Sequence, residues 1–110
     1  MGYQQENAAL LALAVRAAEL GAAVIREAAP RARSLDWRTK SPTDFVTEVD
    51  VAAETAILGL LRAELPSATV LAEESAAGTS AAAVRQGLAL VVDPLDGTTN
   101  FIHGLPVYAV

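Results

Sequence analysis

Two carboxylates follow the most apolar short run of the chain. Residues 88–92 (LALVV) form a strand-length, partly β-branched stretch, and Asp93 and Asp96 come directly after it. Pro94 has no N–H to donate to a ladder, so the predicted strand must end before it. The acidic residues are therefore expected at the carboxyl end of a buried strand, where ligands bind in layered α/β folds.

The residues of this turn favour binding of a hard cation next to an anion. Asp93 and Asp96, with Pro94 fixing φ between them, could direct both carboxylates at one Mg²⁺ or Ca²⁺ ion. Gly97 allows a left-handed backbone or a close approach, and Thr98, at the start of a short helical turn, would present N–H groups to an anion. These groups suggest a phosphate ester held with its metal. The alternative is a solvated Asx-turn closed by Gly97.

Two better-known acidic loops do not fit. An EF-hand requires an oxygen ligand at the third position of the loop, and Leu95 stands there. The haloacid dehalogenase phosphatases begin with D-x-D-G-T, in which the first Asp is a covalent nucleophile. This chain has one residue more between Asp93 and Asp96, so the two side chains cannot occupy the same relative positions.

Two acidic segments precede this turn. Residues 68–72 are predicted to form a short strand that ends in Glu73-Glu74-Ser75, although adjacent carboxylates after a strand are often only a polar edge. Asp50 ends the stretch Thr47-x-x-Asp50, which has the spacing of a capping box and predicts a helix from there to Pro66. The alternative for Asp50 is a first-turn carboxylate favoured by the helix dipole. If the three segments converge, two carboxylates at ~4 Å repel by ~4 kcal/mol at an effective dielectric constant of ~20, so the site would require cations.

The remaining elements are predicted to be helices. Residues 5–29 are rich in alanine and are expected to form one long core helix closed by Pro30. Its apolar residues recur at helical spacing along one stripe: Leu10, Leu13, Ala14, Ala17, Gly21, Val24 and Ile25. The second helix is expected to bury a similar face: Ala53, Ala56, Ile57, Leu60, Leu61 and Leu65.

Composition excludes several functional classes. The 110 residues suffice for one domain at most, and the formal net charge is −5. The basic residues are scattered, which argues against nucleic acid as a direct partner. The absence of cysteine excludes disulfides and zinc–thiolate sites. Arg16, Glu19 and Arg26 interrupt the first apolar helix, so no membrane span is expected, and a cytoplasmic location is the default prediction.

The turn resembles a known signature in nine consecutive residues. D-P-L-D-G-T-T-N-F, from Asp93 to Phe101, is similar to the D-P-[IL]-D-G-T-x-N-F signature of the inositol monophosphatase family of Mg²⁺-dependent, Li⁺-sensitive phosphatases. The segment from Ser41 to Asp50 resembles the family's S-P-x-D-x-V-T-x-x-D. The family's G-E-E-S appears here with Ala72 in place of the glycine.

The resemblance implies a role for each matching residue. The metal ligands would be Glu73, Asp93, the carbonyl of Leu95, and Asp96. Thr98 and Asp50 would orient the attacking water, and Glu73 would help to activate it. The implied substrate-binding residues are Glu73, Leu95, Asp96, Gly97 and Thr98.

The fold that the resemblance implies is α/β, a layered α-β-α-β-α sandwich of the inositol monophosphatase and sugar phosphatase type. Only its amino-terminal part, two helices and then strands, is expected in this chain. The family's second signature, similar to W-D-x-A-x-G, does not occur, and the alternating residues 107–110 indicate a chain cut within a strand. Residues 1–110 are therefore expected to be the amino-terminal portion of a single phosphatase domain, inactive alone.

The implied function of the full-length protein is hydrolysis of inositol 1-phosphate or a similar small polyol or sugar phosphate by water that Mg²⁺ activates. The T-N-F after D-G-T favours the inositol branch over relatives that act on histidinol phosphate or a phosphoadenosine nucleotide. A homodimer is expected. The alternative is a non-catalytic or regulatory binding protein of the same fold, since some bacterial relatives are similar to transcription-complex factors.

Overall fold

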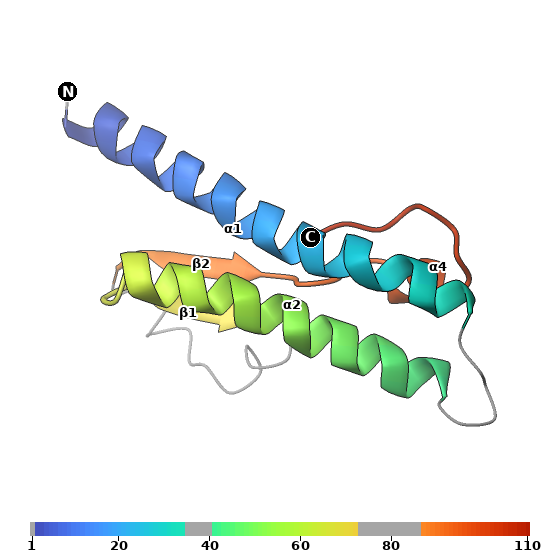
Figure 1. Ribbon diagram of the computed structural model, residues 1–110. Coiled ribbons are helices and arrows are strands. Elements are labelled where there is room, and N and C mark those ends of the chain that lie inside the picture. Colours follow the sequence, from blue (N-terminus) through green and yellow to red (C-terminus); the bar gives the residue numbers. More distant parts are fainter. Residues whose placement is uncertain (1, 35–40, 73–86) are drawn as a thin grey trace.

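The computed structural model describes residues 2–34, 41–72 and 87–110 (Figure 1). Two helices come first, then two strands, and a short helix follows the second strand. The elements are α1 (Gly2–Arg33), α2 (Pro42–Glu64), β1 (Thr69–Ala72), β2 (Ala89–Val92) and α4 (Thr98–Ile102). The predicted order of two helices followed by strands is confirmed.

The two long helices pack along the stripes that the sequence predicts. On α1, the buried side chains include Leu13, Ala17 and Ile25, and on α2 they include Ala53 and Ile57. Small residues allow the backbones to approach each other: a Cβ atom on Gly21 would lie 2.7 Å from Cδ1 of Ile57. The hydrophobic stripes therefore meet between the helices in two core clusters, one with Leu13, Ala17 and Ile57 and the other with Ile25 and Ala53.

The first helix continues beyond the end that Pro30 predicts. Pro30 lies inside α1, which runs on to Arg33, so the predicted end at residue 29 is wrong. Pro30 and Arg26, whose carbonyl loses its helical donor, both lie on the exposed side of the helix, where water can bond that carbonyl. Ala28 is buried and Ala32 packs against the same core cluster, so tertiary contacts hold the last turn.

Between Gln4 and Arg33, the same helix is long and apolar enough to cross a membrane by length and composition. Core helices of soluble proteins have the same property, and α1 packs its Leu13, Ala17 and Ile25 against the rest of the fold. This feature is weak evidence for a membrane segment. The predictions of a cytoplasmic location and of no membrane span stay predictions.

The second helix begins earlier than the sequence predicts. Ser41 is its N-cap, and the Ser41 hydroxyl accepts a hydrogen bond from the N–H of Asp44 at 3.1 Å. Pro42 occupies the first turn, where its fixed φ suits a helix and its missing N–H has no cost. The predicted cap at Thr47 is therefore wrong: Thr47 lies inside the helix and its hydroxyl donates to the carbonyl of Thr43 at 2.9 Å.

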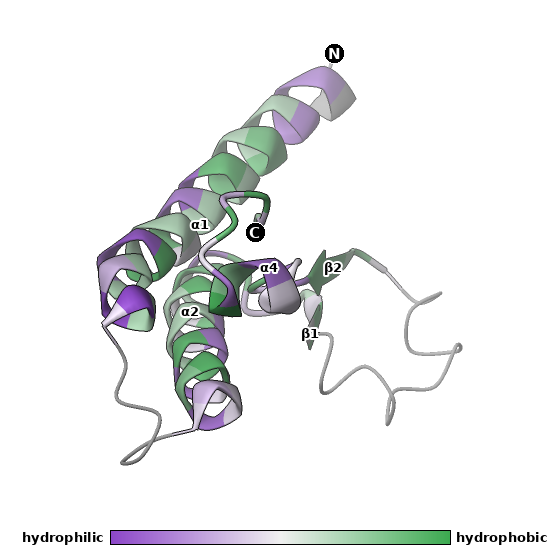
Figure 2. Cartoon of the chain, turned by 90° about the vertical axis from the view of Figure 1, so that its right-hand side faces the viewer, coloured by the Kyte–Doolittle hydropathy of each residue, from purple (hydrophilic) through white to green (hydrophobic). Residues whose placement is uncertain are grey.

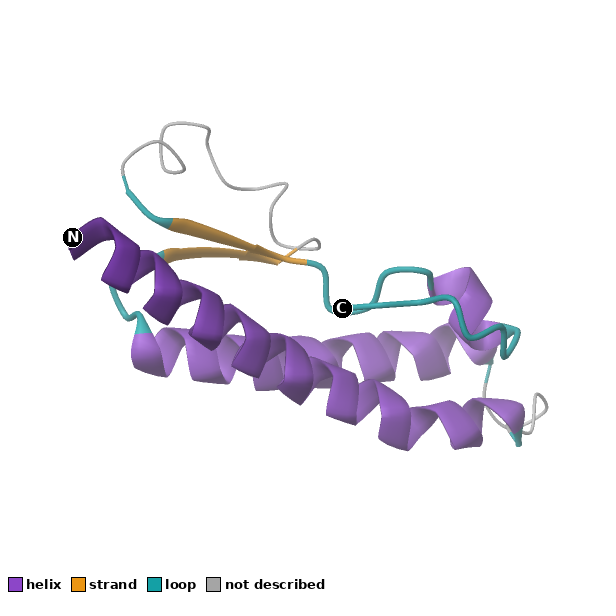
Figure 3. Ribbon diagram, turned by 90° about the horizontal axis from the view of Figure 1, so that it is seen from above, coloured by secondary structure: helices purple, strands orange, loops and turns teal. Residues whose placement is uncertain are grey.

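The two strands are parallel and lie on one side of the helix pair (Figure 3). Their residues pair in register from Thr69 with Ala89 to Ala72 with Val92. β2 is hydrophobic along its length (Figure 2). Val92 is buried against the helices, whereas Val91 is 76% exposed on the opposite face. The strands at residues 68–72 and 88–92 are thus confirmed to within a residue at their amino-terminal ends.

An aromatic cluster anchors the segment after β2. The rings of Phe45 on α2 and Phe101 on α4 stack with centroids 6.3 Å apart, and Tyr108 meets Phe101 edge-on at 5.2 Å. Leu95 is only 2% exposed and belongs to the same core. The turn between β2 and α4 is therefore fixed by buried apolar side chains at both ends.

Candidate functional site

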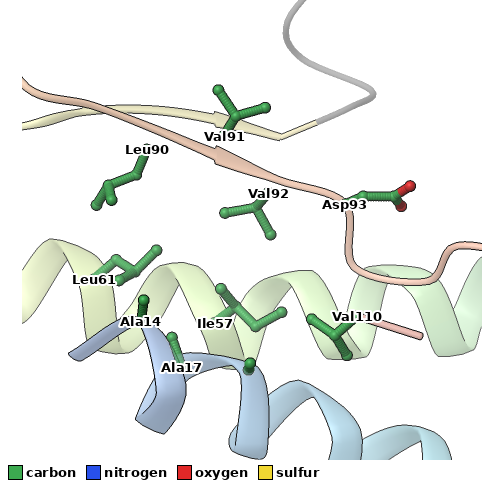
Figure 4. A pocket seen from close by; sticks show the side chains of 10 residues that line it. Ala14, Ala17, Ile57, Leu61, Leu90, Val91, Val92, Asp93 and Val110 are labelled. Carbon is green, nitrogen blue, oxygen red and sulfur yellow. The ribbon is translucent and has the colours of Figure 1, made fainter. Parts of the chain in front are cut away.

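Asp93 is the first residue after β2 and is half-buried. One of its carboxylate oxygens, Oδ1, is shielded from solvent and has no hydrogen-bond partner within the described part of the chain. In Figure 4 its carboxylate points past the end of the strand, whereas Val92 points toward Ile57 of α2. A shielded carboxylate oxygen without a donor is costly unless a cation or a donor binds it.

An apolar cavity of about 190 Å³ lies beside this carboxylate, between α1, α2 and β2 (Figure 4). Its lining residues are Ala14, Ala17, Ala18, Ile57, Leu61, Leu90, Val91, Val92, Asp93 and Val110. Asp93 is the single charged residue among these described ones. The other described lining residues offer no polar side chain to a phosphate. We therefore expect a cation or phosphate to bind at the turn after Asp93 and not inside the cavity.

The turn places Asp96, Gly97 and Thr98 in a rigid backbone. Asp96 is exposed, but its N–H donates to the carbonyl of Ala109 at 2.8 Å and its carbonyl accepts from the N–H of Ala109 at 3.1 Å. Gly97 adopts the left-handed conformation, with φ 84° and ψ 41°, and Thr98 begins α4. Of the two uses expected of Gly97, the left-handed backbone is confirmed, and so is the predicted helical turn.

The return segment 105–109 closes over this turn, a contact that sequence reasoning missed. A Cβ atom on Gly97 would lie 2.9 Å from the carbonyl oxygen of Val107. The side-chain amide of Asn100 donates to that same carbonyl at 2.8 Å. The motif contained Asn100, but no pattern indicated its partner. The alternation at residues 107–110 predicted a strand; the structure has an isolated antiparallel bridge of Asp96 with Ala109.

Asp50 comes from the interior of α2 and not from its first turn, because the helix begins at Pro42. The residue is half-buried, and its Oδ1 is shielded from solvent. The alternative interpretation as a first-turn carboxylate is therefore wrong, since the first turn holds Asp44. The role of Asp50 in orienting water stays a prediction.

The predicted metal site is described only in part. Glu73 follows β1 but lies outside the described residues. Within those residues, no three His, Cys, Asp or Glu side chains gather as a metal site. The donor chemistry nevertheless fits Mg²⁺, which takes oxygen ligands, because Asp93 offers a shielded carboxylate oxygen without a donor. The ligand roles of Glu73, Asp93, Leu95 and Asp96 stay predictions.

Comparisons with known proteins agree with the fold. The chain is 40% identical over 101 residues to the protein named Nus factor SuhB of Pasteurella multocida, covering 92% of this chain and 37% of that protein. It is 41% identical over 103 residues to the Nus factor SuhB of Escherichia coli K12, with the same coverage. The chain thus spans little more than a third of the length of these relatives.

A solved structure is similar as well. The inositol monophosphatase II of Staphylococcus aureus MSSA476 matches with a TM-score of 0.61 and 32% sequence identity, over 86% of this chain and 33% of that one. This neighbour confirms the fold class as the amino-terminal part of the layered phosphatase architecture. The sequence profile described as the inositol monophosphatase family matches residues 6–110. The chain therefore belongs to the inositol monophosphatase family.

Proposed function

We propose that the longer protein, of which residues 1–110 would form the amino-terminal portion, is a Mg²⁺-dependent phosphomonoesterase acting on inositol 1-phosphate or a similar small polyol or sugar phosphate. The observation that carries the proposal is the shielded Oδ1 of Asp93 at the end of β2, which has no hydrogen-bond donor among the described residues. The left-handed turn at Gly97 supports it as well. The turn leads directly into α4, whose first N–H groups could bind a phosphate. Family membership supports phosphatase chemistry in general.

Each residue of the site would have a distinct task. Bound Mg²⁺ would supply Lewis-acid activation of water and neutralise charge on the phosphate. Asp93, Asp96 and the carbonyl of Leu95 would contribute oxygen ligands together with Glu73. Thr98 and Asp50 would orient the attacking water, and Glu73 would accept its proton.

The backbone would complete the phosphate site. The first N–H groups of a helix have no intrahelical acceptor, so those of Gly97 and Thr98 are available to an anion. Asp93 borders the apolar cavity between α1, α2 and β2, and a low-polarity surrounding strengthens charge interactions. Li⁺ sensitivity and a homodimer remain part of the proposal.

The test measures phosphate release from inositol 1-phosphate by the full-length protein with Mg²⁺, with and without Li⁺. Asp96→Asn is expected to reduce the rate at least 100-fold, while Glu64→Gln, an exposed carboxylate at the end of α2, keeps it. Equal rates for wild type and Asp96→Asn would refute the proposal. A trapped aspartyl-phosphate on Asp93 would instead indicate covalent catalysis of the dehalogenase kind.

A second candidate function is that of a Nus factor, a protein partner in a transcription complex. The names of the relatives at about 40% identity favour it. The experiment is copurification of full-length wild type and Asp93→Asn with RNA polymerase complexes. Retention of both proteins would support a binding role that does not need the carboxylate, and retention of neither would refute it.

A further inference from the structure

Asn100 connects two parts of the chain around the acidic turn. Its side-chain amide donates to the carbonyl of Val107 at 2.8 Å, and its backbone carbonyl accepts from the N–H of Leu105 at 2.9 Å. One residue of α4 thus holds both the start and the middle of the return segment. The side-chain hydrogen bond joins residues seven positions apart, so it constrains the path of the return segment and not only the helix.

The carbonyl that Asn100 holds lies directly over the glycine of the turn. Val107 O would be 2.9 Å from a Cβ atom on Gly97, and the backbone of Tyr108 would be 3.3 Å away. Two residues beyond Val107, Ala109 makes both backbone hydrogen bonds to Asp96. The amide of Asn100 therefore fixes the segment that in turn fixes the φ and ψ of Asp96.

Within the described residues, the hydrogen bonds that restrain Asp96 involve its backbone. Asp96 is exposed, whereas its neighbour Leu95 is 2% exposed and held by the core. Buried Leu95 holds the chain before Asp96, and α4, capped at Gly97, holds the chain after it. The bridge to Ala109 adds the two hydrogen bonds that restrain the backbone of Asp96 itself. The solvent-exposed hydrogen bond from Asn100 to Val107 can thus influence the direction in which Asp96 presents its oxygens.

We propose that Asn100 is a positioning residue: through Val107 and the Asp96–Ala109 bridge it orients the Asp96 carboxylate for the cation and phosphate. This inference rests on the proposed phosphatase function. It assigns Asn100 no contact with substrate or metal. Its effect must therefore appear in cation affinity and in the protection of the bridge amides, not only in global stability.

The experiment uses the full-length protein with Asn100→Leu, which has nearly the same size but no donor, and Asn100→Ala, which adds no bulk. Thr99→Val is the matched control, because Thr99 is the exposed neighbour on α4 and its side chain has no described bond to the return segment. Amide hydrogen exchange of Asp96 and Ala109 is measured without Mg²⁺ or substrate. Mg²⁺ affinity is measured by calorimetry, and KM and kcat by phosphate release.

Both Asn100 variants are expected to exchange the two bridge amides about tenfold faster and to need about tenfold more Mg²⁺ for half-saturation, as loss of one hydrogen bond predicts. If the amides of Asp96 and Ala109 exchange at the wild-type rate in both variants, the Asp96–Ala109 bridge does not connect Asn100 to Asp96, and the proposal is wrong. Faster exchange with unchanged Mg²⁺ affinity would overturn the positioning role while leaving the phosphatase proposal intact. Wild-type protein that neither binds Mg²⁺ nor releases phosphate would overturn the proposed function, and this inference with it.

Discussion

Ala72 lies opposite Val92 at the last paired position of the two parallel strands. Because parallel strands that pair in register end at the same level, Ala72 and Val92 lie at the same edge of the sheet. Asp93 is the residue after β2, and Glu73 follows β1 in the sequence. The register supports the prediction that carboxylates 20 positions apart in the chain bind one cation.

Glu73→Gln and Asp93→Asn are expected to interact strongly in Mg²⁺ binding. Each single change should raise the Mg²⁺ concentration for half-saturation by about tenfold or more, because a charged ligand is lost. The double variant should show less than the product of the two effects, since both remove ligands of the same ion. Calorimetric titration of the full-length proteins measures this. If the fold-change in the double variant equals the product of the two single fold-changes, the two carboxylates do not bind the same ion.

Asp93→Asn is expected to stabilise the protein when Mg²⁺ is absent. The substitution removes the charge from a shielded oxygen without a donor in the described part, which should raise the free energy of unfolding by about 1 kcal/mol. Added Mg²⁺ should stabilise wild type more than the variant, because a ligand that binds the folded state raises the free energy of unfolding more, the more tightly it binds. Urea unfolding with and without Mg²⁺ measures both. A variant less stable than wild type without Mg²⁺ would contradict the argument.

Two glycines should respond to alanine in opposite directions. Gly97 has φ 84° and would place a Cβ 2.9 Å from Val107 O, so Gly97→Ala should destabilise the protein by about 1–3 kcal/mol. Gly59 lies in α2, and no described atom outside its own helix turn would lie within 4 Å of a Cβ, so Gly59→Ala should stabilise the protein by about 0.5–1 kcal/mol. Thermal and urea unfolding compare the pair. If both substitutions changed the free energy of unfolding in the same direction, the argument from the backbone conformation of Gly97 would be wrong.

Sequence patterns located the strands and the carboxylate at the end of β2 because apolar runs and proline act locally. They misplaced the end of α1, where tertiary contacts compete: buried Ala28 and the packing of Ala32 carry α1 past Pro30. The start of α2 was also misplaced, although its cap at Ser41, followed by Pro42, is local. The contact of Val107 with Gly97 could not be predicted, since no local rule pairs those residues. The position of Glu73 relative to Asp93 stays a prediction, because residue 73 lies outside the described part of the chain.

The two candidate caps of α2 can be separated by mutation. Ser41→Ala should cost about 1 kcal/mol of stability, because the N–H of Asp44 loses its acceptor. Thr47→Ala should be neutral or slightly stabilising, because Thr47 is inside the helix and alanine has the higher helix propensity. Urea unfolding of both variants, with Ser41→Asp as the cap-preserving control, tests the assignment. If Thr47→Ala lowered the stability more than Ser41→Ala, the helix would start at Thr47 and not at Ser41.

The contact of Gly21 with Ile57 predicts a coupled pair in the helix core. Gly21→Ala would place a Cβ 2.7 Å from Cδ1 of Ile57, whose side chain is 1% exposed and cannot move freely. Overpacking of this kind costs about 1–3 kcal/mol and should exceed the gain in helix propensity. Ile57→Val alone should cost about 0.5–1.5 kcal/mol, but it removes the clashing methyl group. The double variant should therefore be more stable than the sum of the single effects, as a double-mutant cycle of urea unfolding would measure. Strict additivity would mean that α1 and α2 separate at this point and that the close approach does not hold in solution.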